Sequence, residues 1–382
     1  MHREQYGGTA ARPRSRLVGR SVQLERLEAL YERARNGSGG LALLWGEAGV
    51  GKTRLLDEFS SRTLGKGARI AAAACFEFLC PPFAPLREVY GALGIPAPFE
   101  ADETRPRSET ARYQAFLAAA ESLKAAAATP VVIVIDDLQW ADFATLEFLA
   151  FLMPRLANSM LLVLGAVRTE QIERDHARHE ALSRLGRQGA VSLQIPPLEV
   201  AEMRRLVSAL WPAAAANRER DIGRVCALAE GKPYFAEELV SSAVAERGGT
   251  KFEAVPLSIR AGVLTRFEQL APAQRQTLLY ASVIGRSFDA ALLAQVTRSS
   301  AGDVSAALGL AHDFQLVREV RESPGRFVFR HAITREILYR ELLAFQSRAI
   351  HREVAERLVE AGGDSVDLAY HWNAAGDAGR GS

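Results

Sequence analysis

The residues best suited to chemistry lie in GEAGVGKT, residues 46–53, between an apolar run and a helix-periodic segment. The three glycines let the backbone adopt positive φ angles, so that successive N–H groups can point at one anion. Lys52 adds a positive charge for phosphate oxygens, and Thr53 adds a hydroxyl for Mg²⁺. The spacing GxxxxGK[ST] between a strand and a helix therefore predicts a phosphate-binding loop. The residues predicted to bind the nucleotide here are Gly46, Gly49, Val50, Gly51, Lys52 and Thr53.

A pair of acids ends the apolar run of PVVIVIDDLQWAD, residues 130–142. Asp136, at the end of the expected strand, is predicted to hold Mg²⁺ together with Thr53. Asp137 is predicted to orient the attacking water or to accept its proton. Two adjacent acids could also belong to a solvated turn, but a strand at this spacing from the glycine loop suits the same sheet.

Arg168 ends another apolar run, LLVLGAV at 161–167. The planar guanidinium matches the geometry of phosphate oxygens, so Arg168 is predicted to contact the γ-phosphate. A surface salt bridge is the alternative for this residue. The catalytic residues predicted from the strand ends are Asp136, Asp137 and Arg168.

Short apolar runs must position these residues. They lie at 41–45, 69–75, 131–136, 161–167 and 191–195, and amphipathic stretches such as 110–127 and 144–157 lie between most of them. Continuous apolar strands that alternate with helices are typical of a parallel sheet covered on both faces. Ligands of such sheets bind beyond the carboxyl ends of the strands. The fold class predicted is therefore an α/β P-loop NTPase fold.

Helical periodicity dominates after residue 198. Helices at 273–284, 288–296 and 301–312, followed by a hairpin of 316–320 and 326–330, predict a winged-helix domain. A helix at 347–361 carries Ile350, Val354, Leu358 and Val359 on one face, which requires a partner helix. The domain limits we expect are 1–16 for a disordered lead-in, 17–198 for the ATPase domain, 199–255 for a helical lid, 256–345 for the winged helix and 346–382 for the start of a helical, TPR-like region.

Composition narrows the class of protein. The chain has 382 residues, 48% hydrophobic and 24% charged, as in ordinary globular proteins. Its net charge of +2 gives no electrostatic case for nucleic acid or an acidic surface. No apolar run is long enough to span a membrane, and the N-terminus has no secretory h-region. Cys75, Cys80 and Cys226 have no CxxC spacing, so neither zinc nor disulfides are expected, and a cytoplasmic protein is predicted.

Several motifs together resemble one family. They are LVGR (17–20), GEAGVGKT, CFEFLCPPFAPL (75–86), IDDLQWAD, GAVRTE, GKPYFAEELV (231–240) and FRHAITREILY (329–339). In this order they resemble the STAND class of AAA-type P-loop ATPases. More narrowly, the chain is similar to the nucleotide-binding part of the large LuxR-type transcriptional regulators of actinobacteria. The resemblance covers nearly the whole chain, from Leu17 to Asp377.

The resemblance implies that the segment Val18, Gly19 and Arg20 lies over the adenine. Ser21 stands where the family usually has glutamate. Gly231 and the following Pro233 match the family's GxP motif, whose proline packs near the base. A helix-breaking turn is the alternative for this segment.

His331 matches the position where related signalling ATPases often place a histidine on the ADP phosphate. A structural histidine is the alternative. One charge-assisted hydrogen bond of about 1.5–3 kcal/mol would bias a switch roughly tenfold to hundredfold. Because a full switch needs about 5.5 kcal/mol, we expect Arg168, Pro233 and His331 to act together.

The resemblance and the motifs predict a slow ATPase that acts as an ATP/ADP-dependent switch in transcriptional regulation, with ATP or ADP and Mg²⁺ as cofactors. We expect ATP binding to promote self-association or binding of a protein partner. One alternative is a DNA-binding, initiator-type AAA ATPase with a winged helix, and another is the sensor module of a fused signalling enzyme. The expected helices at 288–296 and 301–312 are almost without cations, so direct DNA binding by this chain is not expected. The family continues into helical repeats and a helix-turn-helix, whereas this sequence ends after the helices of 347–375.

Overall fold

The computed structural model describes residues 17–76, 81–99, 109–172, 175–212, 218–245, 256–320, 323–360 and 365–376. The expected lead-in at 1–16 and Cys80 lie outside these residues. The described residues form two compact units. The first comprises residues up to 206 together with 231–234, and the second comprises 207–230 and the residues from 235 onward. The domain limits expected from the sequence stay predictions.

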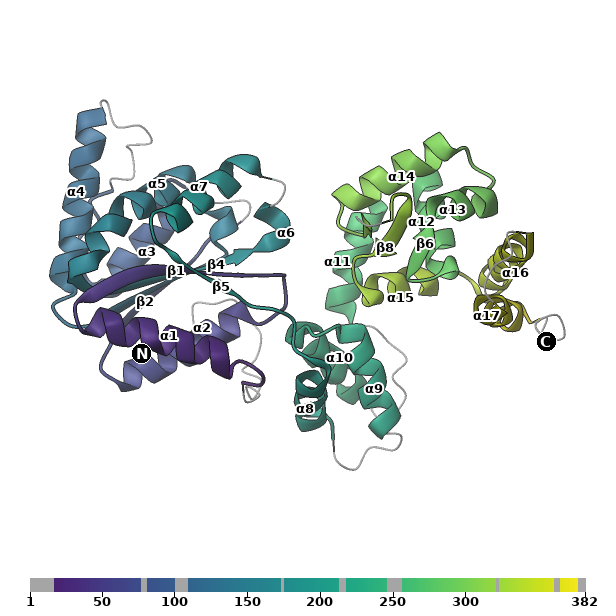
Figure 1. The fold of residues 1–382 in the computed structure, drawn as a ribbon, viewed down its shortest axis with the longest axis horizontal. Coiled ribbons are helices and arrows are strands. Elements are labelled where there is room, and N and C mark those ends of the chain that lie inside the picture. The colour runs from purple at the N-terminus through teal and green to yellow at the C-terminus, as the bar shows by residue number, and fades with distance from the viewer. Residues whose placement is uncertain are drawn as a thin grey trace. The chain divides into compact units, whose positions relative to one another are not determined.

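The first unit is built on a five-stranded sheet in which every neighbouring pair is parallel (Figure 1). The strands are β1 (Ser38–Gly46), β2 (Arg69–Ala74), β3 (Val131–Asp136), β4 (Ser159–Arg168) and β5 (Val191–Gln194), in the order β2-β3-β4-β1-β5. All five apolar runs predicted as strands are confirmed. The order places β4 between β1, which ends at the glycine loop, and β3, which ends at Asp136.

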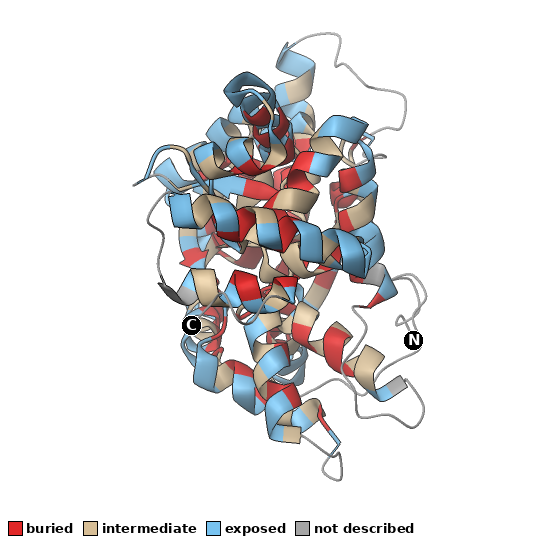
Figure 2. Ribbon diagram, turned by 90° about the vertical axis from the view of Figure 1, so that its right-hand side faces the viewer, coloured by how far each residue is buried: buried red, intermediate tan, exposed pale blue. Residues whose placement is uncertain are grey.

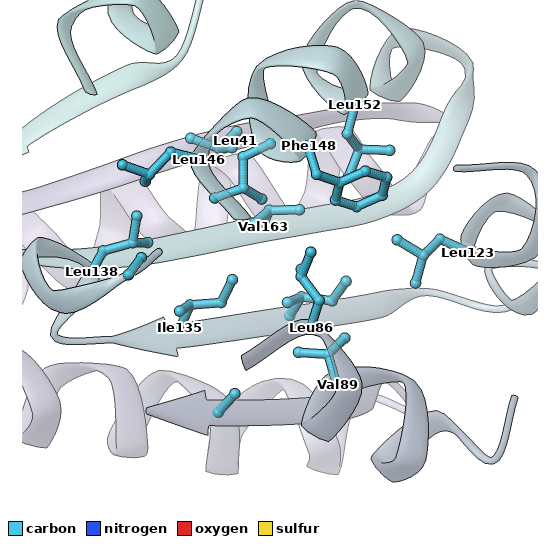
Figure 3. Close-up of a cluster of buried hydrophobic side chains, with 14 of the residues drawn as sticks. Leu41, Leu86, Val89, Leu123, Ile135, Leu138, Leu146, Phe148, Leu152 and Val163 are labelled. Atoms are coloured by element: carbon cyan, nitrogen blue, oxygen red, sulfur yellow. The ribbon is translucent and has the colours of Figure 1, made fainter. Parts of the chain in front are cut away.

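Alternate strand residues face two separate cores. Leu41 and Leu43 of β1 belong to one core, and Ala42 and Leu44 belong to the other. Figure 3 shows Leu41, Val163 and Ile135 with Phe148 from a covering helix. Helices α3 (Ala84–Leu93), α4 (Glu109–Ala126), α5 (Phe143–Leu152) and α7 (His176–Arg187) contribute to the first core, and α1 (Ser21–Arg35) and α2 (Lys52–Gly65) to the second. The prediction of a parallel sheet covered on both faces is therefore confirmed.

The remaining described chain is mostly helical. Its helices are α6 (Thr169–Ile172), α8 (Val200–Leu210), α9 (Arg218–Ala229), α10 (Pro233–Ala245), α11 (Leu257–Glu268), α12 (Pro272–Ile284), α13 (Ala290–Thr297), α14 (Ala301–Asp313), α15 (Ala332–Arg340), α16 (Ala344–Glu360) and α17 (Ser365–Ala375), with short 3₁₀ segments at Leu138–Trp140 and Met153–Asn158. Figure 2 shows helices in which buried and exposed residues lie on different sides. In α14, for example, Val304, Ala307, Leu308 and Ala311 are buried and the residues between them are exposed, so this helix covers a core with one face.

A small antiparallel sheet lies among the helices of the second unit. Its strands are β6 (Ser287–Asp289), β8 (Arg326–Phe329) and β7 (Val317–Glu319), in that order. The predicted hairpin is confirmed as β7 and β8. The helix predicted from residue 288 is wrong at its start, because Asp289 is extended and caps α13 by accepting from the Ala291 and Leu292 N–H groups. The winged-helix assignment stays a prediction.

The apolar face of α16 has the partner helices it requires. Ile350 and Val354 are buried in one cluster with Val283 of α12 and Val296 of α13, and Leu358 packs against it. Val359 is 57% exposed, so its predicted place on this face is wrong. A helix turns by about 100° per residue, and this turn carries Val359 away from the stripe that includes Leu358.

A buried histidine pair joins α16 to α17. Nδ1 of His351 lies 2.8 Å from Nδ1 of His371, and Nε2 of His351 lies 3.0 Å from the Tyr339 hydroxyl. Both contacts are satisfied when Tyr339 donates to His351 and His351 donates to His371, with both rings neutral. Burial lowers the pKa of His351 to about 4, and His371 and Arg335 act in the same direction. Burial also lowers the pKa of His371, against the opposing effect of Asp367.

The histidine pair predicts that the second unit loses stability in mild acid. The folded pKa of His351, about 4, lies below its ordinary value of 6.5, so its contribution is full above pH 6.5 and falls as the pH drops towards 4. Between pH 7.5 and pH 5.0 this loss is about 2 kcal/mol for His351 alone. Urea unfolding followed by circular dichroism at the two pH values measures it. His351→Gln should flatten the pH dependence and the exposed-site change His179→Gln should not; equal slopes in all three proteins would contradict the prediction.

Candidate nucleotide-binding site

The glycine loop connects the end of β1 at Gly46 to the start of α2 at Lys52. Gly49 and Gly51 have φ values of 80° and 95°, a region that favours glycine. Within the described part of the chain, the N–H groups of Gly49, Val50 and Gly51 donate to no protein acceptor. These donors, next to the N-terminus of a helix, form a cradle suited to phosphate oxygens.

Lys52 lies against the loop. Its ammonium donates to the backbone oxygens of Gly46 at 2.7 Å and Glu47 at 2.9 Å, and the residue is only 6% exposed. Burial lowers the pKa of Lys52 to about 8; Arg168 adds to this lowering, while Glu170 opposes it most strongly among the carboxylates. The side chain therefore remains mostly cationic at neutral pH, and it can exchange these two neutral carbonyl acceptors for charged phosphate oxygens, which bind a cation more strongly.

Thr53 and Asp136 meet at the carboxyl edge of the sheet. The Thr53 hydroxyl donates to Asp136 Oδ2 at 2.6 Å, and Asp136 Oδ1 accepts from the Asp137 N–H at 2.9 Å. Burial raises the pKa of Asp136, and Asp137 adds to the effect while Thr53 opposes it. Mg²⁺ in such sites takes one or two protein oxygens, the rest of its ligands being water and phosphate. The hydroxyl and carboxylate fit that donor set, so Thr53 and Asp136 would hold the ion, whose charge would favour ionised Asp136.

The two other predicted catalytic residues form an ion pair. Arg168 Nε and Nη2 each donate to an oxygen of the Asp137 carboxylate at 2.7 Å. Gln139, which is 2% exposed, donates to Asp137 Oδ1 at 2.8 Å and accepts from the Arg168 N–H at 2.9 Å. Asp137 and Arg168 are therefore held by each other and by Gln139. Gln139 was not predicted from the sequence, although it stands three residues after Asp136 in the DDLQWAD segment.

A further acid touches the loop. Glu170 Oε1 accepts a hydrogen bond from the Ala48 N–H at 2.8 Å. The sequence motifs include this residue only as the last letter of GAVRTE and predict no role for it. Its position two residues after a strand that ends at the sheet's ligand-binding edge is the signal that could have found it.

The segment predicted to lie over adenine is tied to the loop. The Arg20 guanidinium, in a residue that is 4% exposed, donates to the Val50 oxygen at 2.9 Å and the Pro196 oxygen at 2.7 Å. Gly19 has a φ of 67°, and a Cβ there would come within 2.5 Å of the Glu202 side chain. Val18 is half-buried. Contact of these residues with a base stays a prediction.

The GxP segment lies against the glycine loop in the same unit. The Tyr234 N–H donates to the Gly49 oxygen at 3.3 Å, and Lys232 forms an ion pair with Glu47 at 2.5 Å. A Cβ on Gly51 would lie 3.8 Å from Pro233 Cγ. The structure thus brings Pro233 beside the residues predicted to bind phosphate.

His331 belongs to the second unit. Its Nδ1 lies 3.6 Å from Glu230 Oε2, and Glu230 also pairs with Arg286 and accepts from the Ala332 N–H. Burial would raise the pKa of Glu230, but the hydrogen bond from His331 and the charge of Arg286 outweigh it and the pKa is lowered. Within this unit His331 has a structural partner. Its predicted contact with ADP stays a prediction.

Part of the chain matches a known protein family. The family model of the AAA ATPase domain matches residues 16–164. An uncharacterized protein of Rhizobium meliloti is 21% identical over an alignment that covers 94% of this chain and 39% of that protein. This chain thus spans well under half the length of that relative.

Two solved structures have a similar fold. The ORC2 protein of Aeropyrum pernix, in ADPNP and ADP complexes, has a TM-score of 0.53 at 13% identity and covers 90% of this chain and 95% of its own. A Walker-type ATPase of Pyrococcus abyssi has a TM-score of 0.53 at 15% identity and covers 86% and 99%. Within the described residues, no helix combines the length and apolar character needed to cross a bilayer. The family match over residues 16–164, together with the sheet order and the glycine loop, shows that the chain carries an AAA-type P-loop ATPase domain.

Proposed function

We propose that this protein is an ATP/ADP-dependent conformational switch of the STAND type that hydrolyses ATP slowly and acts in transcriptional regulation. The observation that carries the proposal is the meeting of three kinds of group at one sheet edge. The N–H groups at 49–51, which have no acceptor among the described residues, the Lys52 ammonium and the Thr53–Asp136 contact together match a nucleoside phosphate with Mg²⁺. The motif resemblance supports the narrower assignment to signalling.

Slow hydrolysis is consistent with the state of Asp137. In hydrolysis, a water oxygen attacks the γ-phosphorus. The bond between the γ-phosphorus and the oxygen that bridges to the β-phosphate breaks, and the products are ADP and inorganic phosphate. Asp137 would orient the water, but its carboxylate is held by Arg168 in two hydrogen bonds of 2.7 Å. A γ-phosphate that draws Arg168 away would release Asp137 for this role. Hydrolysis would therefore depend on an earlier step in which Arg168 leaves Asp137 for the γ-phosphate, and it would be slow for this reason.

Chain connectivity offers a route from the loop to the second unit. The segment 231–234, which contacts Gly49 and Glu47, is preceded by Glu230 and followed by Phe235. Both flanking residues belong to the second unit. A nucleotide that changes the glycine loop would therefore act on a segment that is covalently continuous with that unit on both sides.

The output we propose is association with a second copy or with a protein partner when ATP is bound. Direct DNA binding is not part of the proposal, because α13 and α14 contain no lysine or arginine. A helix that lies on DNA needs such residues for phosphate contacts. A fold similar to that of ORC2 does not by itself supply such residues.

The proposal predicts that purified protein retains ADP and that exchange for ATP with Mg²⁺ changes its sedimentation coefficient. Analytical ultracentrifugation of the ADP-bound, ATP-bound and EDTA-treated protein measures this. Removal of Mg²⁺ should weaken ATP binding, since Thr53 and Asp136 then have no cation to share with the phosphates. Identical sedimentation in both nucleotide states, with fast turnover and no retained nucleotide, would show a constitutive ATPase instead of a switch.

A further inference from the structure

Glu170 is an acid for which the proposed site has no assigned role. It lies in the short helix α6, two residues after Arg168. Its Oε1 accepts from the Ala48 N–H at 2.8 Å. Its Oε2 is buried and has no hydrogen-bond donor within the described residues. One carboxylate oxygen is thus bound to the glycine loop, and the other has lost water without gaining a partner.

The backbone N–H of Ala48 differs from those of the next loop residues in having an acceptor. The N–H groups of Gly49, Val50 and Gly51 have no protein acceptor in the described chain, whereas that of Ala48 donates to an anionic group. Glu170 also opposes the lowering of the Lys52 pKa more strongly than any other carboxylate does, which shows that its charge is felt at the lysine. The chain itself therefore places an anion at the edge of the phosphate cradle.

We propose that Glu170 is an internal competitor of the nucleotide and sets the affinity of the site. This inference rests on the function proposed above. An amide N–H makes one full-strength hydrogen bond, so a phosphate oxygen can use Ala48 only after the carboxylate has left. A carboxylate that remained nearby would repel the phosphates in a partly buried site. Each effect lowers the affinity for ATP and ADP.

Glu170→Gln tests the proposal because it removes the charge and keeps the length of the side chain. The Kd of ADP and of ATP with Mg²⁺ should fall roughly tenfold, as expected when a charge-assisted contact no longer has to be broken. Titration with a fluorescent adenine nucleotide measures the Kd. Glu170→Ala, which leaves the Ala48 amide without an acceptor, should shift the Kd in the same direction. Thermal unfolding of both variants shows which of them are folded, and the Kd is compared for the folded ones.

Glu88→Gln, the same change on the exposed surface of α3, is the matched control and should leave the Kd unchanged. Equal or weaker nucleotide binding by the folded Glu170 variants overturns the proposal. Unchanged binding with loss of hydrolysis also overturns it and makes Glu170 a catalytic base. If wild type binds nucleotide and Lys52→Ala does not, the nucleotide site on which the proposed function rests is present, and the results of the Glu170 variants then test this inference alone. If wild type and the Glu170 variants bind no nucleotide, the function and the inference fail together.

Discussion

Lys52→Ala is expected to abolish the proposed retention of ADP by the purified protein and to raise the Kd of ADP and ATP at least about hundredfold. The lysine is the buried cation of the cradle, and its present acceptors are the Gly46 and Glu47 oxygens at 2.7 and 2.9 Å. When a nucleotide binds, charged phosphate oxygens take the place of these neutral acceptors. The stronger hydrogen bonds that Lys52 then makes are its contribution to the binding energy. Chromatographic identification of nucleotide released by denaturation, followed by titration calorimetry, measures the effect.

Lys66→Ala is the matched control for this change. Lys66 caps the other end of α2, is 41% exposed and pairs with Glu32 at 3.4 Å. Its removal deletes the same charge from the same helix, and its exposed ion pair contributes little to stability. The control should retain nucleotide like the wild type. Normal nucleotide retention by the Lys52 variant would mean that the loop does not bind phosphate and would remove the basis of the proposed switch.

The strands of the first unit could be predicted closely from the sequence. Runs such as VVIVID, residues 131–136, are continuous and apolar because both faces of a parallel sheet are buried, and their short length between helical segments favours a strand over a buried helix. The start of α13 could not be predicted in this way. Phe288 continues the apolar periodicity of that helix but is buried in the strand β6, and Asp289 begins the helix by capping it. Periodicity alone does not separate a buried residue before a cap from one after it.

The residues of the candidate site also divide into those that could be predicted from the sequence and those that could not. Lys52, Thr53 and Asp136 could be assigned because their roles depend on motif spacing within one loop and one strand end. The partners of Arg168 could not, since its contact with Asp137 depends on how two strand ends meet and on a side-chain rotamer. Glu170 was missed for the same reason: a hydrogen bond across 122 positions of the chain leaves no local pattern.

The Asp137–Arg168 pair would allow the proposed site to bind ATP without hydrolysing it quickly. Both side chains are partly exposed, at 25% and 35%, so the pair can open at modest cost. Gln139 is buried and contacts the side chain of one residue and the backbone of the other, so it would keep Asp137 in place when Arg168 moves to a phosphate. The pair would then close again after phosphate leaves.

Asp137→Asn should therefore separate binding from hydrolysis. The amide cannot accept a proton from water and cannot hold Arg168 by charge, so hydrolysis should fall about hundredfold to thousandfold. Nucleotide affinity should be unchanged or slightly higher, because Arg168 no longer has to leave an anionic partner before it contacts phosphate. Single-turnover hydrolysis of preloaded radiolabelled ATP, together with titration of ADP, measures the two quantities independently.

Asp313→Asn makes the same chemical change at a side chain that is 71% exposed on α14 and should leave both quantities at their wild-type values. Hydrolysis by the Asp137 variant at the wild-type rate would show that Asp137 serves only to hold Arg168. Loss of nucleotide binding together with hydrolysis would point to a collapsed site, in which the 2.9 Å hydrogen bond from the backbone N–H of residue 137 to Asp136 is no longer kept. Retained binding with lost turnover is the outcome that requires the carboxylate itself, because the asparagine keeps the shape and the backbone contact and removes the negative charge and the proton acceptor.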